Sequence, residues 1–218
     1  ATVYNNRAYV IGGLDKQVGI ECQVYTSENN SWLFEFPSLP KGRFNSVCFV
    51  YRDSLYVFGG TDNSSNMNEI VRYDLSTQNS GEWTTIAKVN EANQRGGVAF
   101  VVEDKVYAGL GEKSNGIRNG FYVSSDSLTK WELIPSIPAQ LGVISSGVYD
   151  EQKKSFFMID NDGKIWEYNL TTEQWTSRSL WIRMKNYHMF MLDGSIYILG
   201  QDIYQKNKFT VYNPIWDN

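Results

Sequence analysis

One segment of this chain recurs along its whole length, and this repetition constrains the fold more than any other feature. The segment runs Leu55-Tyr56-Val57-Phe58-Gly59-Gly60, continues with Val71-Arg72-Tyr73-Asp74 and ends with Glu82-Trp83-Thr84. A unit with four short apolar runs cannot bury its own faces, and it becomes stable only by stacking on further copies. We therefore expect an array of stacked units.

Five copies can be laid out, each with an apolar strand, a later tyrosine and then a tryptophan. The apolar strands are residues 8–13, 55–60, 106–111, 156–161 and 196–201. The later aromatic residues are Tyr25, Tyr73, Tyr122, Tyr168 and Tyr212, followed by Trp32, Trp83, Trp131, Trp175 and Trp216. Successive tryptophans lie 51, 48, 44 and 41 positions apart. Four strands in a period of roughly 40–50 residues are typical of a β-propeller.

The order Tyr-x-x-Gly-Gly, then an aromatic strand ending in Tyr-Asp, then Trp, resembles the kelch repeat over essentially the whole chain. This resemblance implies an all-β, kelch-type β-propeller in one domain, residues 1–218, with five four-stranded blades and room for a larger ring. The expected blades are residues 1–40, 41–90, 91–139, 140–180 and 181–218. The expected structural residues are Gly12, Gly13, Gly59, Gly60, Tyr25, Tyr73, Trp32, Trp83, Trp131 and Trp175.

Physical chemistry agrees with these structural roles. Glycine takes a positive φ without a Cβ penalty, so a glycine pair after a buried strand allows a sharp bend and close packing. The fourth unit has Asp160-Asn161 at this place, and we expect this pair to adopt the same left-handed conformation. The tyrosines and tryptophans are expected to pack between neighbouring blades.

The first unit is incomplete. Aligning Tyr9 with Tyr56 places Ala1 opposite Cys48, so the counterpart of residues 41–47 is missing from the first unit. Two interpretations stay open: five blades that close without a strand borrowed from the opposite terminus, or a piece of a longer protein with more sequence upstream. We favour the second.

Composition excludes several function classes. The net charge is −4 with no basic stripe, which argues against nucleic-acid binding. No run approaches the 18 apolar residues that a membrane-spanning helix needs. Cys22 and Cys48 lie in apolar strand context and are expected to be buried free thiols.

The chemistry available to a metal or cofactor is limited. His188 is the single histidine and is expected to be structural or on the surface. Kelch-type copper oxidases resemble galactose oxidase, whose site needs two histidines, so copper chemistry is disfavoured. We expect no metal and no cofactor, and the chain carries no phosphate loop and no Gly-x-Ser-x-Gly elbow.

The candidate ligand site is the mouth of the propeller. In kelch domains, ligands usually meet the loops that enter the first strand of each blade and those that link the second strand to the third. The candidate binding residues are Arg43, Asn45, Gln94, Arg95, Arg183 and Lys185. Arg95 and Lys185 align with Phe44, one step after Arg43, and would point to the other side unless the entry loop bulges. A ring of cations would favour a carboxylate, although ordinary solvated loop cations explain the same pattern.

Three functions of different classes follow. The first is a non-catalytic module that binds a protein or a glycan on one face. The second resembles the kelch-type sialic acid mutarotases (N-acetylneuraminate epimerases), with Arg43 or Arg95 on the carboxylate and Glu112 or Asp160 as acid or base. The third is a structural blade array in a larger cell-surface protein.

The location of the protein and the exposure of Arg43 are further expectations. Resemblance to kelch repeats of secreted bacterial proteins implies an extracytoplasmic location, either secreted, periplasmic or at the cell surface. An exposed Arg43 would allow Arg43→Ala to abolish anion binding while leaving the melting temperature nearly unchanged.

Overall fold

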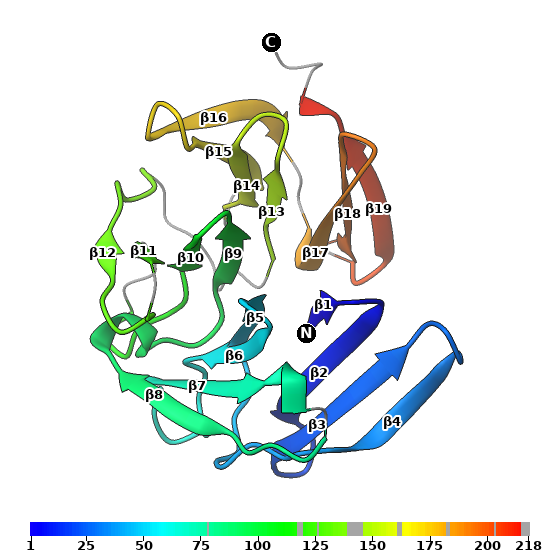
Figure 1. Cartoon of the computed structure of the whole chain (residues 1–218). Helices are drawn as coiled ribbons and strands as arrows, with labels where there is room; N and C mark the ends of the chain where they lie inside the picture. Colours follow the sequence, from blue (N-terminus) through cyan, green and yellow to red (C-terminus); the bar gives the residue numbers. More distant parts are fainter. Residues whose placement is uncertain are drawn as a thin grey trace.

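The structure is a computed structural model that describes residues 1–77, 79–116, 120–125, 127–138, 146–160, 163–181, 184–202 and 204–214. Apart from two short 3-10 turns, Leu75–Thr77 and Asn90–Ala92, the regular structure in these residues is β-strand. Five antiparallel sheets follow one another around a ring (Figure 1), which confirms the predicted five-bladed, all-β propeller.

Each blade is an antiparallel meander whose strands follow chain order. Blade 1 holds β1 (Thr2–Tyr4), β2 (Arg7–Leu14), β3 (Val18–Thr26) and β4 (Ser31–Phe36). Blade 2 holds β5 (Val47–Tyr51), β6 (Ser54–Phe58), β7 (Glu69–Asp74) and β8 (Thr84–Lys88). Blade 3 holds β9 (Val98–Val102), β10 (Lys105–Gly109), β11 (Phe121–Ser125) and β12 (Glu132–Leu133).

The last two blades follow the same plan. Blade 4 holds β13 (Val148–Asp150), β14 (Ser155–Ile159), β15 (Lys164–Asn169) and β16 (Gln174–Trp181). Blade 5 holds β17 (Lys185–Leu192), β18 (Ser195–Gln201) and β19 (Asn207–Tyr212). Trp216, which marks the expected fourth strand of blade 5, lies outside the described residues.

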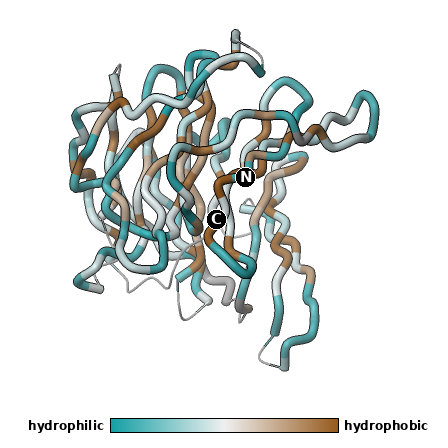
Figure 2. Tube along the Cα trace, turned by 90° about the horizontal axis from the view of Figure 1, so that it is seen from below, coloured by the Kyte–Doolittle hydropathy of each residue, from teal (hydrophilic) through white to brown (hydrophobic). Residues whose placement is uncertain are grey.

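Tight turns join the first and second strands. Asn5 and Asn6, like Arg52 and Asp53, have φ values between 47° and 58°. Two successive left-handed residues match the twist of flanking antiparallel strands, and Asn and Asp tolerate this conformation. In such a meander, the connections between second and third strands lie at the opposite end of the blade. Figure 2 shows polar loops projecting at both ends of the apolar strands.

Among the residues that the structure describes, four apolar clusters hold neighbouring blades together. Blades 1 and 2 meet around Val24, Val57 and Tyr73, and blades 2 and 3 meet around Phe58 and Val106. Blades 3 and 4 pack through Phe121 and Phe156, which are fully buried, and blades 4 and 5 through Phe157 and Ile198. The sheets of blades 2, 3 and 4 therefore use one face toward the preceding blade and the other toward the following blade.

The repeated aromatic residues contribute to these interfaces. The Trp83 Nε1–H donates to the Pro37 carbonyl in blade 1 (2.9 Å), and the Trp175 Nε1–H donates to the Pro135 carbonyl in blade 3 (2.7 Å). The Trp131 ring lies edge-on to Phe58 of blade 2, with 5.1 Å between centroids. Three of the repeated tryptophans thus join their blade to the preceding one.

The glycine pairs bring successive blades into backbone contact. The N–H of Gly13 donates to the carbonyl of Arg43 (2.9 Å), and that of Gly60 donates to the carbonyl of Gln94 (2.8 Å). A Cβ at Gly59 would lie 2.4 Å from the Ala92 oxygen, which a real side chain does not allow. Glycine is therefore needed in this pair for two reasons: the backbone has a positive φ, and the next blade approaches closely.

Blade 4 replaces the glycine pair by a different device. Asp160 was expected to adopt a left-handed conformation, but it is not among the described residues with positive φ, so that expectation is wrong. Its carboxylate instead accepts hydrogen bonds from the Lys164 backbone N–H (2.9 Å) and the Trp166 indole N–H (2.7 Å). A side-chain cap thus closes the turn, and Asn161 lies outside the described residues.

Candidate functional site

The entry segments and the loops after the second strands come together on one face of the propeller. Isolated bridges join Phe44 to Thr61 in blade 2 and Arg95 to Glu112 in blade 3. In blade 5, Lys185 at the start of β17 pairs with Gln201 at the end of β18. Phe44, Arg95 and Lys185 therefore occupy corresponding positions. We call the surface formed by these two sets of loops the loop face.

Each entry segment bends directly after this position. The next residue in each blade has a left-handed φ: 50° at Asn45, 69° at Gly96 and 50° at Asn186. Asn45 is exposed, and its carbonyl accepts a hydrogen bond from the Gly96 N–H (2.6 Å), so the entry segments of blades 2 and 3 touch. The entry loops thus depart from a regular strand, as a bulge does.

Arg43 was expected on an exposed loop, and that expectation does not hold, because its side chain is 0% exposed. Its Nη1 donates to the Gly59 carbonyl (3.2 Å) and its Nη2 to a carboxylate oxygen of Glu69 (3.3 Å). Burial lowers the pKa of the guanidinium, and the charge of Glu69 opposes that effect. Arg43 links the entry segment of blade 2 to its glycine pair, and its contact with a ligand stays a prediction.

Gln94 holds the corresponding place in blade 3 and is also buried. Its Oε1 accepts a hydrogen bond from the Gly111 N–H (2.8 Å), which ties the entry segment to the degraded glycine pair. Its Nε2 has no hydrogen-bond partner among the described residues. Buried polar groups are normally paired, so this nitrogen is an unsatisfied group near the loop face, as is the Oδ1 of the neighbouring Asn93.

Arg95 is an exposed cation of the loop face, since 45% of its side chain is accessible. Its Nη2 lies 3.2 Å from a carboxylate oxygen of Glu112, and the backbones of these two residues exchange hydrogen bonds. A second pair joins Lys41 to Asp62 at 2.8 Å. Of the other predicted cations, Arg183 lies outside the described residues, and Lys185 is described by its backbone alone.

The sequence did not predict that acidic residues pair with these cations. Glu69 receives both Arg43 and Lys88, the latter at 3.5 Å, while Glu112 receives Arg95. Glu112 and Thr61 occupy the same position after the second strand, and aligning the repeats identifies that position. The pairing of each acid with a cation depends on loop geometry, which the alignment does not give.

A cavity of about 310 Å³ lies among the first strands of the blades. It is lined by Ala1, Ser46, Val47, Cys48, Gly97, Val98, Ala99, Phe100, Ser146, Gly147 and His188. His188 is exposed, as expected for a surface histidine. Ser146 Oγ accepts a hydrogen bond from the Met189 N–H (2.7 Å) and joins blades 4 and 5 beside this cavity. Its small lining residues leave space along the axis of the ring.

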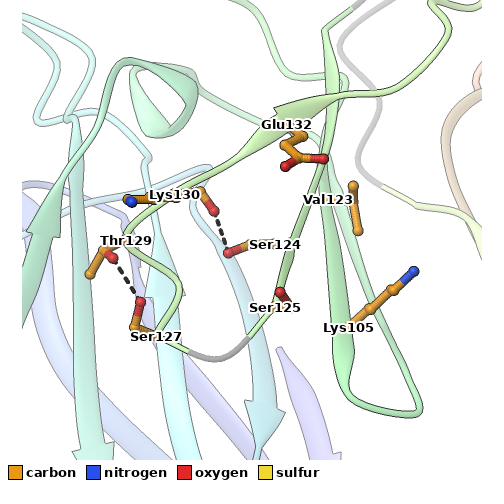
Figure 3. Close-up of a pocket in the computed structure, with 8 residues that line it drawn as sticks. All are labelled: Lys105, Val123, Ser124, Ser125, Ser127, Thr129, Lys130 and Glu132. Atoms are coloured by element: carbon orange, nitrogen blue, oxygen red, sulfur yellow. Dashed lines mark hydrogen bonds between the residues drawn. The ribbon is translucent and has the colours of Figure 1, made fainter.

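A hollow of about 510 Å³ lies on blade 3 beside the turn between its third and fourth strands. Figure 3 shows polar side chains around it, including Ser124, whose hydroxyl donates to the Lys130 carbonyl (2.6 Å), and the Ser127–Thr129 hydroxyl pair (2.7 Å). These hydroxyls satisfy one another or the local backbone. The hollow therefore has the chemistry of a solvated turn.

No acid–base pair or metal cluster emerges from the described part of the chain. Asp160 is committed to Lys164 and Trp166, and Glu112 to Arg95. Within the same residues, no group of three or more His, Cys, Asp or Glu side chains is placed to hold a metal ion. The described residues also contain no helix long and apolar enough to span a membrane.

Comparison with known proteins identifies the repeat. A family model described as the kelch motif matches residues 42–90, which is blade 2 with its entry segment. The chain is a kelch-repeat β-propeller. The propeller is 26% identical to kelch-like protein 36 of Mus musculus over 67% of this chain and 25% of that protein.

Two further comparisons extend over more of the propeller. It is 25% identical to the kelch repeat and BTB domain-containing protein 1 of ectromelia virus, over 97% of this chain and 39% of that protein. The chain thus spans between a quarter and two fifths of the length of these relatives. The solved structure of YjhT superposes with a TM-score of 0.78 at 16% identity, covering 96% of this chain and 82% of that one, and shows the same fold.

Proposed function

We propose that this propeller is a non-catalytic binding module whose loop face receives a protein partner. One observation carries the proposal: in blades 2, 3 and 5 the entry segment lies beside the loop after the second strand, through the pairs Phe44–Thr61, Arg95–Glu112 and Lys185–Gln201. The hydrogen bond from the Gly96 N–H to the Asn45 carbonyl then joins the entry segments of blades 2 and 3. Loops of varied sequence on a rigid repeated scaffold are a common place for recognition. Similarity to kelch-like proteins supports the same class.

The charges of the loop face favour a protein with a mixed polar surface. Lys41 is paired with Asp62 and Arg95 with Glu112. A lone carboxylate would have to compete with those acids for the cations. A partner carrying both signs of charge can instead align with the existing pairs, which gives orientation and specificity.

The sugar-acid mutarotase alternative receives less support from these residues. Its carboxylate would need an accessible arginine, whereas Arg43 is fully buried and Arg95 is paired with Glu112. Its acid or base would need a free carboxyl group, but Asp160 caps a turn. A glycan could still bind to the Asn- and Ser-rich loops of the loop face through neutral hydrogen bonds. The thermal-shift screen below tests this alternative.

Photo-crosslinking tests which face binds. A photoreactive amino acid is placed at Ser64 or Ser114, both exposed on the loop face, and at Glu28 or Thr172, both exposed on the opposite turns. We expect adducts of discrete mass from the loop-face positions and none from the two controls, after irradiation in extracts of the source cells. Equal labelling of both faces, or labelling of the turn face alone, rejects the proposal.

A thermal-shift screen separates a protein partner from a small ligand. Neutral sugars, sialic acid and short acidic peptides are added to the purified propeller. A ligand at about 100 times its dissociation constant adds about 2.7 kcal/mol to the free energy of unfolding. We expect no shift from the sugars. If sialic acid raises the melting temperature and Arg95→Ala abolishes this increase, the loop face is a sugar-acid site and the proposal of a protein partner is wrong.

A further inference from the structure

Two buried polar atoms on neighbouring residues of the blade 3 entry segment have no hydrogen-bond partner among the described residues. They are Oδ1 of Asn93 and Nε2 of Gln94. Gln94 is 1% exposed. Leaving a buried donor or acceptor unpaired is unfavourable, so such atoms are rare in folded proteins and each needs a physical reason.

The backbone that carries these two side chains is held in place by hydrogen bonds. The N–H of Asn93 donates to the Asn90 carbonyl (3.2 Å). The N–H of Gln94 donates to the Ala92 carbonyl (2.7 Å), and Asn93 between them has φ −73° and ψ 67°, the values of an inverse γ-turn. The Gln94 carbonyl accepts the N–H of Gly60 from blade 2 (2.8 Å). The unpaired atoms are therefore a property of the side chains.

Blade 2 satisfies the corresponding side chain with an acid. Arg43 holds the place of Gln94, and its Nη2 donates to the carboxylate of Glu69 (3.3 Å). Glu69 lies at the start of β7, where its carbonyl accepts the N–H of Gly59 (3.2 Å). The acid that receives Arg43 thus has a defined position in the repeat.

Blade 3 has no acid at that position. The N–H of Leu110, which follows β10, donates to the carbonyl of Gly120 (2.7 Å). Gly120 therefore holds the place of Glu69, and a glycine offers no side-chain acceptor. Oε1 of Gln94 accepts the Gly111 N–H (2.8 Å), which leaves Nε2 as the donor without an acid.

Tyr122 stands beside this position but does not serve Gln94. A Cβ on Gly120 would lie 2.5 Å from the Tyr122 hydroxyl oxygen. That oxygen accepts a hydrogen bond from Nζ of Lys113 (2.9 Å) and none from Gln94. An acceptor for Nε2 of Gln94 must therefore come from outside the described part of the chain.

The two unpaired atoms are of opposite kinds, and this defines the group that pairs them. Nε2 of Gln94 only donates, and Oδ1 of Asn93 only accepts. A peptide chain carries a carbonyl oxygen for the first and an N–H for the second, in one amide group or in two consecutive ones. A carboxylate has no hydrogen for Asn93, and the neighbouring cation, Arg95, is already paired with Glu112 (3.2 Å). An amide therefore fits better than an anion.

Both atoms lie on the loop face, where blade 3 meets blade 2. The Gly96 N–H donates to the Asn45 carbonyl (2.6 Å), and Nδ2 of Asn66 donates to the Glu112 carbonyl (2.8 Å). We call this contact between the two blades the seam. Asn93 is partly exposed, so the seam reaches the surface there. Because the two atoms themselves are buried, an amide group reaches them only when the seam opens locally.

We propose that Asn93 and Gln94 form an amide-binding site at the seam, which takes main-chain amide groups from an extended segment of the protein partner. The free protein keeps the two atoms unpaired, and the bound segment pairs both. This inference rests on the proposed loop-face function and deepens it, because it names the chemistry of the segment that binds.

NMR with main-chain probes tests the site before a partner is identified. The probe is N-acetyl-triglycine N-methylamide, which has peptide groups and no side chains. Its fully N-methylated analogue keeps the carbonyl groups but has no N–H. We expect the first probe to shift the side-chain N–H signals of Gln94 in a saturable way and the second to bind at least tenfold more weakly.

The other outcomes of this titration reject the proposal. Signals of Gln94 that respond to neither probe, or equally to both, overturn it. A stronger response to acetate shows an anion site instead. A stronger response to N-acetylglucosamine shows that the site takes the amide of a sugar, and a protein segment is then the wrong ligand.

The Asn93→Leu variant tests whether the unpaired acceptor serves binding. Removing an unpaired buried acceptor at similar volume should leave the melting temperature unchanged or higher, while affinity for the triglycine probe falls at least tenfold. Asn66→Leu removes an amide that has a partner and should lower the melting temperature. If Asn93→Leu lowers it as much, the Asn93 oxygen already has a partner, such as a bound water, and the proposal is overturned.

Photo-crosslinking from Ser64 separates this inference from the loop-face function. In the Asn93→Leu background we expect the adduct yield at Ser64 to fall at least tenfold, whereas Asn29→Leu, exposed on the opposite turns, should leave it unchanged. Full yield in Asn93→Leu overturns the amide site and leaves the loop-face function standing. A complete lack of loop-face adducts in the unmodified background rejects the loop-face function, and the NMR titration then decides on the amide site independently.

Discussion

Gly12 lies so close to Arg43 that a Cβ on the glycine would stand 2.3 Å from the Arg43 carbonyl oxygen. Gly12 belongs to blade 1 and Arg43 to the entry segment of blade 2, so this contact sets how closely the two blades approach. The same relationship returns one blade later, where a Cβ on Gly59 would stand 2.7 Å from the Gln94 oxygen. A backbone contact between blades therefore underlies the glycine pair of the repeat.

Gly12→Ala should destabilise the propeller by more than the cost of placing an alanine in the left-handed conformation. Both Gly12 (φ +63°) and Gly194 (φ +71°) are left-handed, but a Cβ at Gly194 meets nothing within 4 Å. We expect Gly194→Ala to cost about 1 kcal/mol and Gly12→Ala to cost at least about 2 kcal/mol, because the blades must also separate. Urea unfolding of both variants measures the difference, and equal losses would show that the interblade contact is unimportant.

Arg43→Ala should lower stability, contrary to what an exposed position would allow. Removing the guanidinium leaves the Gly59 carbonyl without that donor and opens a buried space. Glu69 keeps Lys88 as a partner and stays partly exposed, so we expect a loss of about 2–3 kcal/mol. Arg95→Ala, at a half-exposed pair, should cost within about 0.5 kcal/mol. Thermal unfolding of the two variants distinguishes these outcomes.

The sequence was enough to predict the blades but not the role of each loop cation. The spacing of Tyr73 and Trp83 repeats, and since strands pair locally within a blade, such spacing determines the fold. The role of Arg43 depends on Glu69, 26 positions away across a loop. The spacing of the repeats in the sequence does not indicate whether such an arginine points to solvent or packs against its own blade. The alignment of Arg95 with Phe44 was correct for the same reason that the fold was: it rests on the repeat.

Asp160 should stabilise blade 4 as a cap. Its carboxylate accepts the Lys164 and Trp166 N–H groups and is largely buried. Asp160→Ala leaves both donors unpaired, and we expect a loss of about 1–3 kcal/mol. Asp160→Gly restores the glycine of the repeat without the acceptor and should not recover the loss. Full recovery by glycine, seen in urea unfolding, would mean that backbone conformation matters here and the cap does not.

Cys22 should be almost unreactive in the folded protein at pH values where an ordinary thiol reacts. Burial raises its pKa to about 12, so at pH 9 its thiolate is rarer than that of a free cysteine by a factor on the order of several hundred. The raised pKa also means that the folded state favours the neutral thiol. The contribution of the Cys22 thiol to the free energy of unfolding is fully present below about pH 9 and is lost as the pH rises toward 12.

The Cys48→Ser variant leaves Cys22 as the single thiol and makes this measurable. An aromatic disulfide reagent at pH 9 should label it at the rate of global unfolding, and urea should accelerate the reaction. The reciprocal Cys22→Ser variant retains Cys48, which is half-buried and lines the axial cavity, and should label faster. Rapid labelling of Cys22 without urea would show that blades 1 and 2 separate locally, because Cys22 packs in the cluster that joins them.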